Sequence, residues 1–323
     1  TFFEMLQQHY HVKLIPRKSL IIFDEVQLYP RARAAIKYLV ADRRFDYLET
    51  GSLISIKKNV KNIVIPSEER PIQMYPMDFE EFLWAMGNET LMPFLQKQFE
   101  TGKPMKELHR EAMDMFRRYM MVGGMPQAVS DYSSNRDIVA LDSVFTSLLT
   151  SYIDDVEKYK TSDTSRNVLR YIISHGWNYA SERITFERFA NSNYKSREVG
   201  DAFRTLQKTM LLELVYPTTE TKLPILPDLK KKPKLLWLDT GLLNYAVGIQ
   251  SEIIGKENIN DAWRGKIAEH VVGQAILGQS NNFLDVRSFW VREAKNSQAE
   301  LDYLYSSRKY GLLPIEVKSG LNT

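Results

Sequence analysis

The sequence contains no cysteine among its 323 residues. Disulfide bonds, thiolate metal sites and a cysteine nucleophile are therefore excluded. The five histidines offer no third ligand to His9 and His11, so no histidine metal centre is expected. No uninterrupted apolar run approaches the ~18 residues that a bilayer span needs, and the first residues have no signal-peptide pattern. These absences predict a cytoplasmic protein without a membrane partner.

A strong charge imbalance is also missing, because 43 basic residues face 40 acidic ones and the net charge is +3. This balance permits contact with nucleic acid but does not by itself indicate it. The apolar fraction of 44% and the charged fraction of 26% are typical of a globular protein and exclude a mostly disordered chain. The length predicts about two or more domains, at ~150 residues each.

The first recognisable unit is a strand–helix–strand pattern. Residues 19–25, SLIIFDE, are an unbroken apolar run ending in two acids, which predicts a strand buried on both faces of a parallel sheet. A helix follows Pro30, and a second strand at 45–48 leads into Thr50-Gly51-Ser52. We assign residues 1–75 to this α/β unit.

Residues 76–160 are helical and rich in methionine and aromatic residues, which predicts a helical connector. Residues 161–225 read as three short helical segments and a strand, the order of a winged helix-turn-helix. Lys195, Arg197, Arg204 and Lys208 on or before its third helix could reach phosphates, and Asn191 or Asn193 could contact bases. The alternative is a surface helix of mixed charge.

Residues 226–323 return to an α/β pattern. The region opens with a basic tract of Lys230, Lys231 and Lys232 with Lys234 close by. We interpret this tract as a solvated linker rather than a phosphate contact.

The acids at the end of the first strand have a defined use in nucleotide hydrolysis. Asp24, in line with the strand, could hold the magnesium ion that bridges two phosphates, and Glu25 could orient the attacking water. A hydroxyl of the Thr50-Gly51-Ser52 turn would lie at the same edge of the sheet. The alternatives are two solvated acids and a simple turn.

Seven segments in order carry a resemblance that covers nearly the whole chain: LIIFDEVQ, LETGSL, YPMDFEEFL, RYMMVGGMPQAV, KPKLLWLDTGLLNYAVG, WRGKIAEH and IEVKSG. The series resembles the prokaryotic AAA-type predicted ATPases with a C-terminal domain of unknown function. The resemblance implies that ATP and Mg²⁺ are the cofactors and that Asp24 and Glu25 are the Walker B acids. It also implies a sensor role for Thr50 or Ser52 and a phosphate-facing role for Arg70.

The sequence departs from this family at one point, because the phosphate-binding loop GxxxxGK[ST] is absent. In the family this loop lies upstream of the Walker B strand. We therefore expect the chain to be a fragment that lacks this loop, and expect it neither to bind ATP tightly nor to hydrolyse it.

A second acidic pattern lies near the C-terminus. Glu269 on a helix, Asp302 on a strand and Glu316-Val317-Lys318 on the next strand resemble the PD-(D/E)xK restriction-endonuclease-like core. In such sites the acids Glu269, Asp302 and Glu316 would bind a divalent metal and Lys318 would activate water. The alternative for Glu316 and Lys318 is a solvated ion pair on one strand face.

The expected fold is thus an α/β multidomain chain with a partial AAA-like sheet, a helical region with a winged helix, and a nuclease-like α/β domain. The expected function is that of an AAA-type ATPase with DNA as partner, on the family resemblance more than on charge. Two alternatives stay open: a metal-dependent nuclease regulated by the ATPase part, and a non-catalytic DNA-binding or interaction protein. A homo-oligomer is one of the open oligomeric states.

Overall fold

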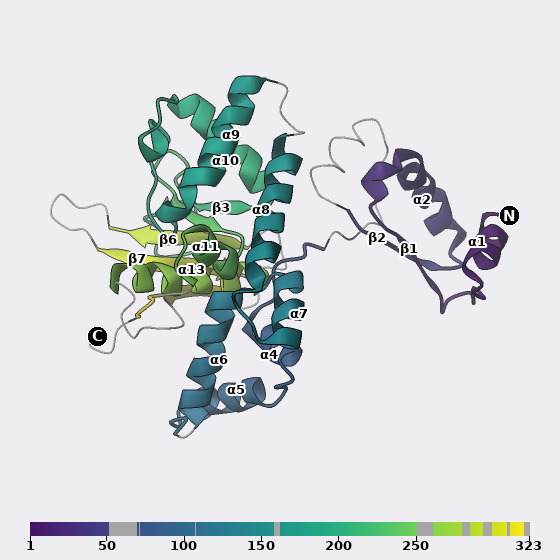
Figure 1. Ribbon diagram of the computed structural model, residues 1–323, viewed down its shortest axis with the longest axis horizontal. Coiled ribbons are helices and arrows are strands. Elements are labelled where there is room, and N and C mark those ends of the chain that lie inside the picture. The colour runs from purple at the N-terminus through teal and green to yellow at the C-terminus, as the bar shows by residue number, and fades with distance from the viewer. Residues whose placement is uncertain are drawn as a thin grey trace. The chain divides into compact units, whose positions relative to one another are not determined.

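The computed structural model describes residues 1–51, 70, 72–106, 108–157, 162–250, 261–279, 285–292, 299–308 and 311–319 (Figure 1). The chain divides into two compact units, Thr1–Ile72 (unit 1) and Gln73–Thr323 (unit 2). The fold is mixed α/β with small sheets, as expected. No helix in the described ranges is both long enough and apolar enough to cross a bilayer.

Unit 1 is built on two parallel strands. Its elements are α1 (Phe2–Tyr10), β1 (Leu20–Phe23), the 3-10 helix η1 (Val26–Leu28), α2 (Pro30–Asp42) and β2 (Asp46–Glu49). Residue Leu20 pairs with Asp46 and Phe23 with Glu49, so both strands end at the same edge. The connection through α2 is the βαβ unit that the sequence predicts.

One prediction for β1 is wrong: the strand is buried on one face and not on both. Ile21 is 8% exposed, whereas Leu20 and Ile22 are 54% and 57% exposed. Ile21 packs with Phe3 and Phe45 in the small core of unit 1. Within the described residues the apolar side chains of this core come from one face of the sheet, so the alternate residues of the run remain in solvent.

Unit 2 begins with a run of helices. These are α4 (Phe79–Ala85), α5 (Leu91–Thr101), α6 (Leu108–Val122), α7 (Pro126–Asn135) and α8 (Leu141–Glu157). Their buried aromatic residues Phe82, Tyr119 and Phe145 belong to the largest core cluster. The methionine- and aromatic-rich pattern is thus a packing pattern.

A helix-and-hairpin assembly follows. It contains α9 (Asp163–His175), two 3-10 helices η2 (Gly176–Tyr179) and η3 (Phe189–Asn191), α10 (Ser196–Lys208), β3 (Leu212–Val215) and β5 (Lys234–Trp237). Strands β3 and β5 pair antiparallel. Isolated β-bridges from Ala180 and Arg183 to β5 place a third, short extended segment beside them.

The remaining elements form a four-stranded sheet with helices beside it. They are β4 (Pro217–Thr218), α11 (Thr240–Ala246), α13 (Asp261–Gln279), β6 (Val286–Val291), β7 (Glu300–Ser307) and β8 (Gly311–Ile315). The strand order is β4-β6-β7-β8, and β6, β7 and β8 pair antiparallel in sequence order.

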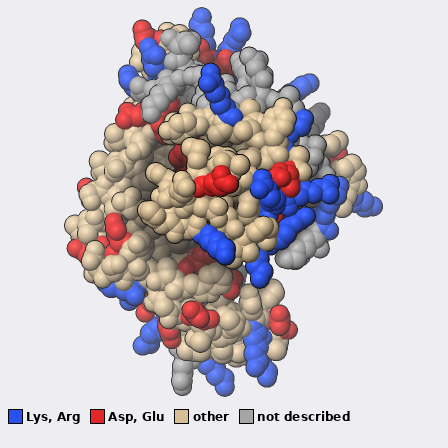
Figure 2. Space-filling model, turned by 90° about the vertical axis from the view of Figure 1, so that its right-hand side faces the viewer, with Lys and Arg blue, Asp and Glu red and all other residues tan. Residues whose placement is uncertain are grey.

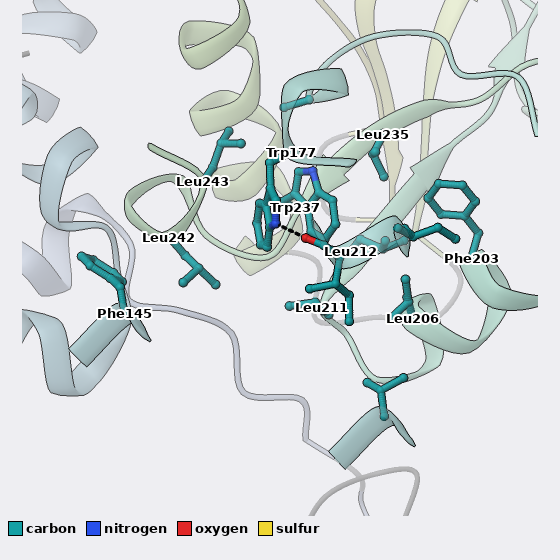
Figure 3. Packing of buried hydrophobic residues seen from close by; sticks show 14 of the residues in the cluster. Phe145, Trp177, Phe203, Leu206, Leu211, Leu212, Leu235, Trp237, Leu242 and Leu243 are labelled. Atoms are coloured by element: carbon teal, nitrogen blue, oxygen red, sulfur yellow. Dashed lines mark hydrogen bonds between the residues drawn. The ribbon is translucent and has the colours of Figure 1, made fainter. Parts of the chain in front are cut away.

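The largest hydrophobic cluster of the described residues runs through much of unit 2. It extends from Phe82 in α4 to Val271 in α13, and near its centre the rings of Trp177 and Trp237 stack with centroids 3.7 Å apart (Figure 3). The expected boundary near 160 lies outside the described residues, and the one near 225 lies between two strands of this unit. The second one separates β3 from β5, which are paired strands.

Candidate functional site

The carboxyl edge of the unit 1 sheet brings three of the predicted site residues together. Asp24 and Glu25 directly follow β1, and Thr50 directly follows β2. The Thr50 hydroxyl donates a hydrogen bond to Asp24 Oδ1 and accepts one from the Glu25 backbone N–H at 3.1 Å. The backbone N–H of Thr50 also donates to Phe23 O at 3.0 Å, and the N–H of Val26 donates to Thr50 O at 3.0 Å. One threonine therefore joins the ends of both strands.

The backbone of Glu25 adopts a left-handed conformation, with φ of 49° and ψ of 47°. A residue other than glycine is uncommon there and persists only where its surroundings hold it. The hydrogen bonds from the N–H groups of Glu25 and Val26 to Thr50 supply that support. Asp24 and Glu25 are exposed and Thr50 is half-buried, so a ligand could approach both carboxylates from solvent.

An arginine that sequence reasoning missed lies next to this edge. Arg33 of α2 forms an ion pair with Glu49, the last residue of β2. Their side chains are only 3% and 15% exposed, so the pair is largely withdrawn from water. It fixes α2 to the end of β2 immediately before Thr50. No sequence pattern marks Arg33 among the other basic residues of α2.

Ser52 and Arg70 are the two remaining predicted residues of this site. Ser52 lies outside the described residues. Arg70 is described and exposed. The roles of both residues stay predictions.

A second group of charges lies in unit 2, around a buried lysine. Lys234 Nζ, at the start of β5, lies 2.6 Å from Glu269 Oε1 of α13, 2.8 Å from Glu300 Oε1 and 3.7 Å from Asp302 Oδ1 of β7. The lysine side chain is 5% exposed. The interpretation of Lys234 as part of a solvated linker is therefore wrong, because α13 and β7 close over it. Lys230, Lys231 and Lys232 are exposed.

The environment shifts the pKa values of both Glu269 and Lys234, the closest pair in this group. Burial raises the pKa of Glu269 to about 7, although the Lys234 ammonium opposes this shift. Burial alone would lower the pKa of Lys234, but Glu269 and Glu300 outweigh it and the pKa is raised. Lys234 thus keeps its positive charge at neutral pH and faces the carboxylates as their cation.

The predicted nuclease-like residues form two ion-pair groups, which a hydrogen bond between Val317 and Asp302 links. Glu269 and Asp302 meet around Lys234, whereas Glu316 and Lys318 form an exposed ion pair of 2.5 Å with each other. Asp302 Oδ2 also accepts a hydrogen bond of 2.8 Å from the Val317 N–H. Among the described residues, no group of three or more histidines and acids has the geometry of a metal site.

A buried polar network joins two of the segments that carry the family resemblance. Asp239, in the segment LDTGLL, is fully buried and accepts hydrogen bonds from the N–H of Gly124 at 2.7 Å and of Leu242 at 2.9 Å. Burial raises the pKa of Asp239, while these hydrogen bonds act in the opposite direction. The neighbouring His270 accepts from the Trp237 N–H at 3.0 Å, and burial lowers its pKa to about 4, so it is neutral.

Two glycines let these segments touch. Gly123 has φ of +74°, and a Cβ there would lie 2.1 Å from Asp239 Oδ1. A Cβ on Gly241 would lie 2.4 Å from the carbonyl carbon of Val122. The segments VGGMP and LDTGLL are therefore packing elements of unit 2, and their buried groups are not open to a ligand.

Comparisons with known proteins find a family for two parts of the chain. Residues 1–83 match a family described as an AAA domain, and residues 113–253 match a Domain of unknown function (DUF8612). No curated protein and no solved structure gives a significant match. Residues 1–83 are thus an AAA-type, ATPase-like region, and a domain of unknown function follows it.

Proposed function

We propose that the carboxyl edge of the unit 1 sheet is the magnesium- and water-binding part of an ATP hydrolysis site. The observation that carries the proposal is the double hydrogen bond of Thr50 to Asp24 and to the Glu25 backbone. It holds two exposed carboxylates at the edge where parallel α/β sheets bind their ligands. The AAA-domain match over residues 1–83 supports the same reaction class.

The donor atoms fit a hard divalent cation. Carboxylate and hydroxyl oxygens are the ligands that Mg²⁺ prefers, and Asp24 would hold this ion together with the ATP phosphates. When bound, Mg²⁺ would neutralise charge on the phosphates. Glu25 would orient the attacking water and accept its proton, while Thr50 keeps both acids in position. Ser52 and Arg70 retain their proposed roles as a second sensor hydroxyl and a phosphate contact.

The phosphate cradle is the part of the site that these 323 residues do not encode, because they contain no GxxxxGK[ST]. Backbone N–H groups and a lysine of such a loop provide most of the contacts to the phosphates. We therefore propose that the chain by itself neither binds ATP tightly nor turns it over.

The test compares ATP turnover and ATP binding in the full-length gene product that contains these residues. We expect Glu25→Gln to abolish turnover and retain binding, and Asp24→Asn to weaken the magnesium-dependent part of binding as well. Asp46→Asn is the matched control, because Asp46 is an exposed acid at the opposite edge of the same sheet. Equal turnover in the wild type and Glu25→Gln would refute the proposed role of the sheet edge. Magnesium-dependent turnover by the 323 residues alone would refute the proposal that they lack the phosphate cradle.

A metal-dependent nuclease is the second candidate, favoured by the convergence of Glu269 and Asp302 next to the antiparallel β6, β7 and β8. The buried Lys234 ammonium weighs against it, since it already supplies the positive charge that these acids require. The test of nuclease activity measures plasmid nicking in the presence of Mn²⁺ by the wild type, Asp302→Ala and Lys318→Ala. Equal nicking by all three proteins would exclude this candidate.

A further inference from the structure

We infer that one end of the helix-and-hairpin assembly in unit 2 binds the phosphate backbone of double-stranded DNA. We call it the basic end and define it by six exposed residues: Arg188, Lys195, Arg197, Lys230, Lys231 and Lys232. The inference rests on the winged-helix interpretation of residues 161–225 extended through β5. It is independent of ATP hydrolysis at Asp24 and Glu25.

Two hydrogen bonds bring the lysine loop to the start of α10. The N–H of Ile184 donates to Pro233 O at 2.9 Å, directly after the three lysines. Three residues further along, Glu187 Oε2 accepts from the N–H of Ser196 at 2.9 Å, at the first turn of α10. Three residues of chain span at most about 10 Å. Segments that are more than thirty positions apart in the sequence thus share one end of the assembly.

The N–H of Arg188 donates to Tyr194 O at 3.2 Å and fixes the turn between these segments. The acids at this end face the backbone. Glu187, Glu198 and Asp228 accept hydrogen bonds from the N–H groups of Ser196, Lys195 and Lys230, respectively. Six cations therefore outnumber three carboxylates, in a chain whose net charge is only +3. Such a local excess is the electrostatic footprint of a phosphate-binding surface.

The turn before α10 indicates duplex DNA rather than another polyanion. Asn191 and Asn193 are exposed there, and their amides can both donate to and accept from base edges. The backbone is held in a left-handed conformation at Arg188, Ala190 and Asn191, with φ of 51°, 52° and 64°. A helix presented by such a turn, with a basic hairpin loop beside it, has the form of a helix that enters the major groove.

An anionic membrane is the rival partner, because Leu226 and Leu229 are 67% and 71% exposed in the same loop as the lysines. A lipid surface, however, presents no fixed pattern of base-edge donors and acceptors for the amides of Asn191 and Asn193 to recognise. The experiment therefore includes vesicles as a separate arm.

The test is a gel shift of the 323-residue chain with a short mixed-sequence duplex, without nucleotide, across about 50 to 200 mM salt. The triple variant Lys230→Ala, Lys231→Ala, Lys232→Ala is expected to bind at least about tenfold more weakly. Its log–log salt slope should be shallower by about 2 to 3, because each lost phosphate contact removes ~0.9. The corresponding triple arginine variant should keep the wild-type affinity.

The matched control is Lys97→Ala, Lys103→Ala, Lys106→Ala. These lysines are exposed at and after α5, at the opposite end of unit 2 from α9 and α10 (Figure 1), and their loss changes the net charge equally. The inference is overturned if the wild type does not shift the duplex at the lowest salt, or if both triple variants weaken binding equally. It is also overturned if phosphatidylserine vesicles bind through the same lysines and the duplex does not. None of these results bears on the proposal for Asp24 and Glu25.

Discussion

The backbone N–H of Gly124 donates a hydrogen bond of 2.7 Å to Asp239 Oδ2, across 115 positions of sequence. The same carboxylate accepts from the N–H of Leu242 and thereby caps α11. A charge that is fully buried is stabilised only when its oxygens are hydrogen-bonded. Asp239 thus links the end of α6 to the start of α11, and the neighbouring glycines determine how closely the two can approach.

Gly123→Ala should destabilise unit 2 far more than a glycine substitution at a comparable backbone conformation. The new Cβ would overlap Asp239 Oδ1, and the left-handed φ adds its own penalty, so we expect a loss of about 3 kcal/mol or more in the free energy of unfolding. Urea denaturation followed by circular dichroism measures this change.

Gly102→Ala is the control for that substitution. Gly102 has φ of +63°, and a Cβ added there would meet no other described atom within 4 Å, so only the conformational penalty of about 1 kcal/mol applies. Equal losses for the two variants would contradict the role assigned to the contact between Gly123 and Asp239.

Lys234→Met should cost about 3–5 kcal/mol of unfolding free energy, because it leaves Glu269, Glu300 and Asp302 facing one another without their cation. Lys318→Met is the matched lysine substitution, and because solvent screens its exposed pair with Glu316, its loss should leave the unfolding free energy nearly unchanged. Thermal or urea unfolding of both variants measures the difference. A Lys234→Met protein as stable as Lys318→Met would show that the buried cluster does not need its lysine.

The stability of unit 2 should fall at alkaline pH, in part through Tyr152. Burial, with the charges of Asp239 and Asp155, raises the pKa of Tyr152 from 10.0 to about 12. Between pH 10 and about 12 the unfolded chain loses the phenolic proton while the folded chain keeps it, and this favours unfolding. The contribution of Tyr152 to the free energy of unfolding is therefore complete below pH 10 and is lost as the pH rises to about 12.

Tyr152→Phe should therefore reduce the pH slope of the unfolding free energy by up to about 1.4 kcal/mol per pH unit above pH 10. Urea denaturation at a series of alkaline pH values measures this slope. Tyr38→Phe is the control, since Tyr38 is 76% exposed and lies in unit 1. An unchanged slope in Tyr152→Phe would contradict the prediction.

The first site could be located from sequence because its geometry is local. An apolar run ending in two acids, a helix and a second strand are all contained in residues 19–50, and parallel pairing places Thr50 beside Asp24. The exposure of Leu20 and Ile22 could not be predicted, because a run of apolar residues does not reveal how many faces of its sheet are covered.

The environment of Lys234 could not be predicted for the opposite reason. Its neighbours come from α13 and β7, 35 and more positions away, and a lysine two residues after a run of lysines has the local pattern of a solvated loop. The burial of Asp239 likewise depends on a contact with Gly124 that no local pattern records.

Surface charge illustrates the same limit. Composition gives a nearly balanced chain, and Figure 2 shows lysine and arginine most dense at the right of the face it presents, with further basic and acidic residues scattered over the rest. The basic end around α10 is likewise assembled from two segments that the sequence separates.

The stacked pair of Trp177 and Trp237 makes intrinsic tryptophan fluorescence a probe of the fold. All five tryptophans lie beyond residue 72, so indole fluorescence originates in unit 2 while unit 1 contributes none. Emission then follows the melting of the larger unit alone, and a transition seen only in peptide ellipticity belongs to the smaller one. The two units can thus be distinguished in a single titration without attaching a dye.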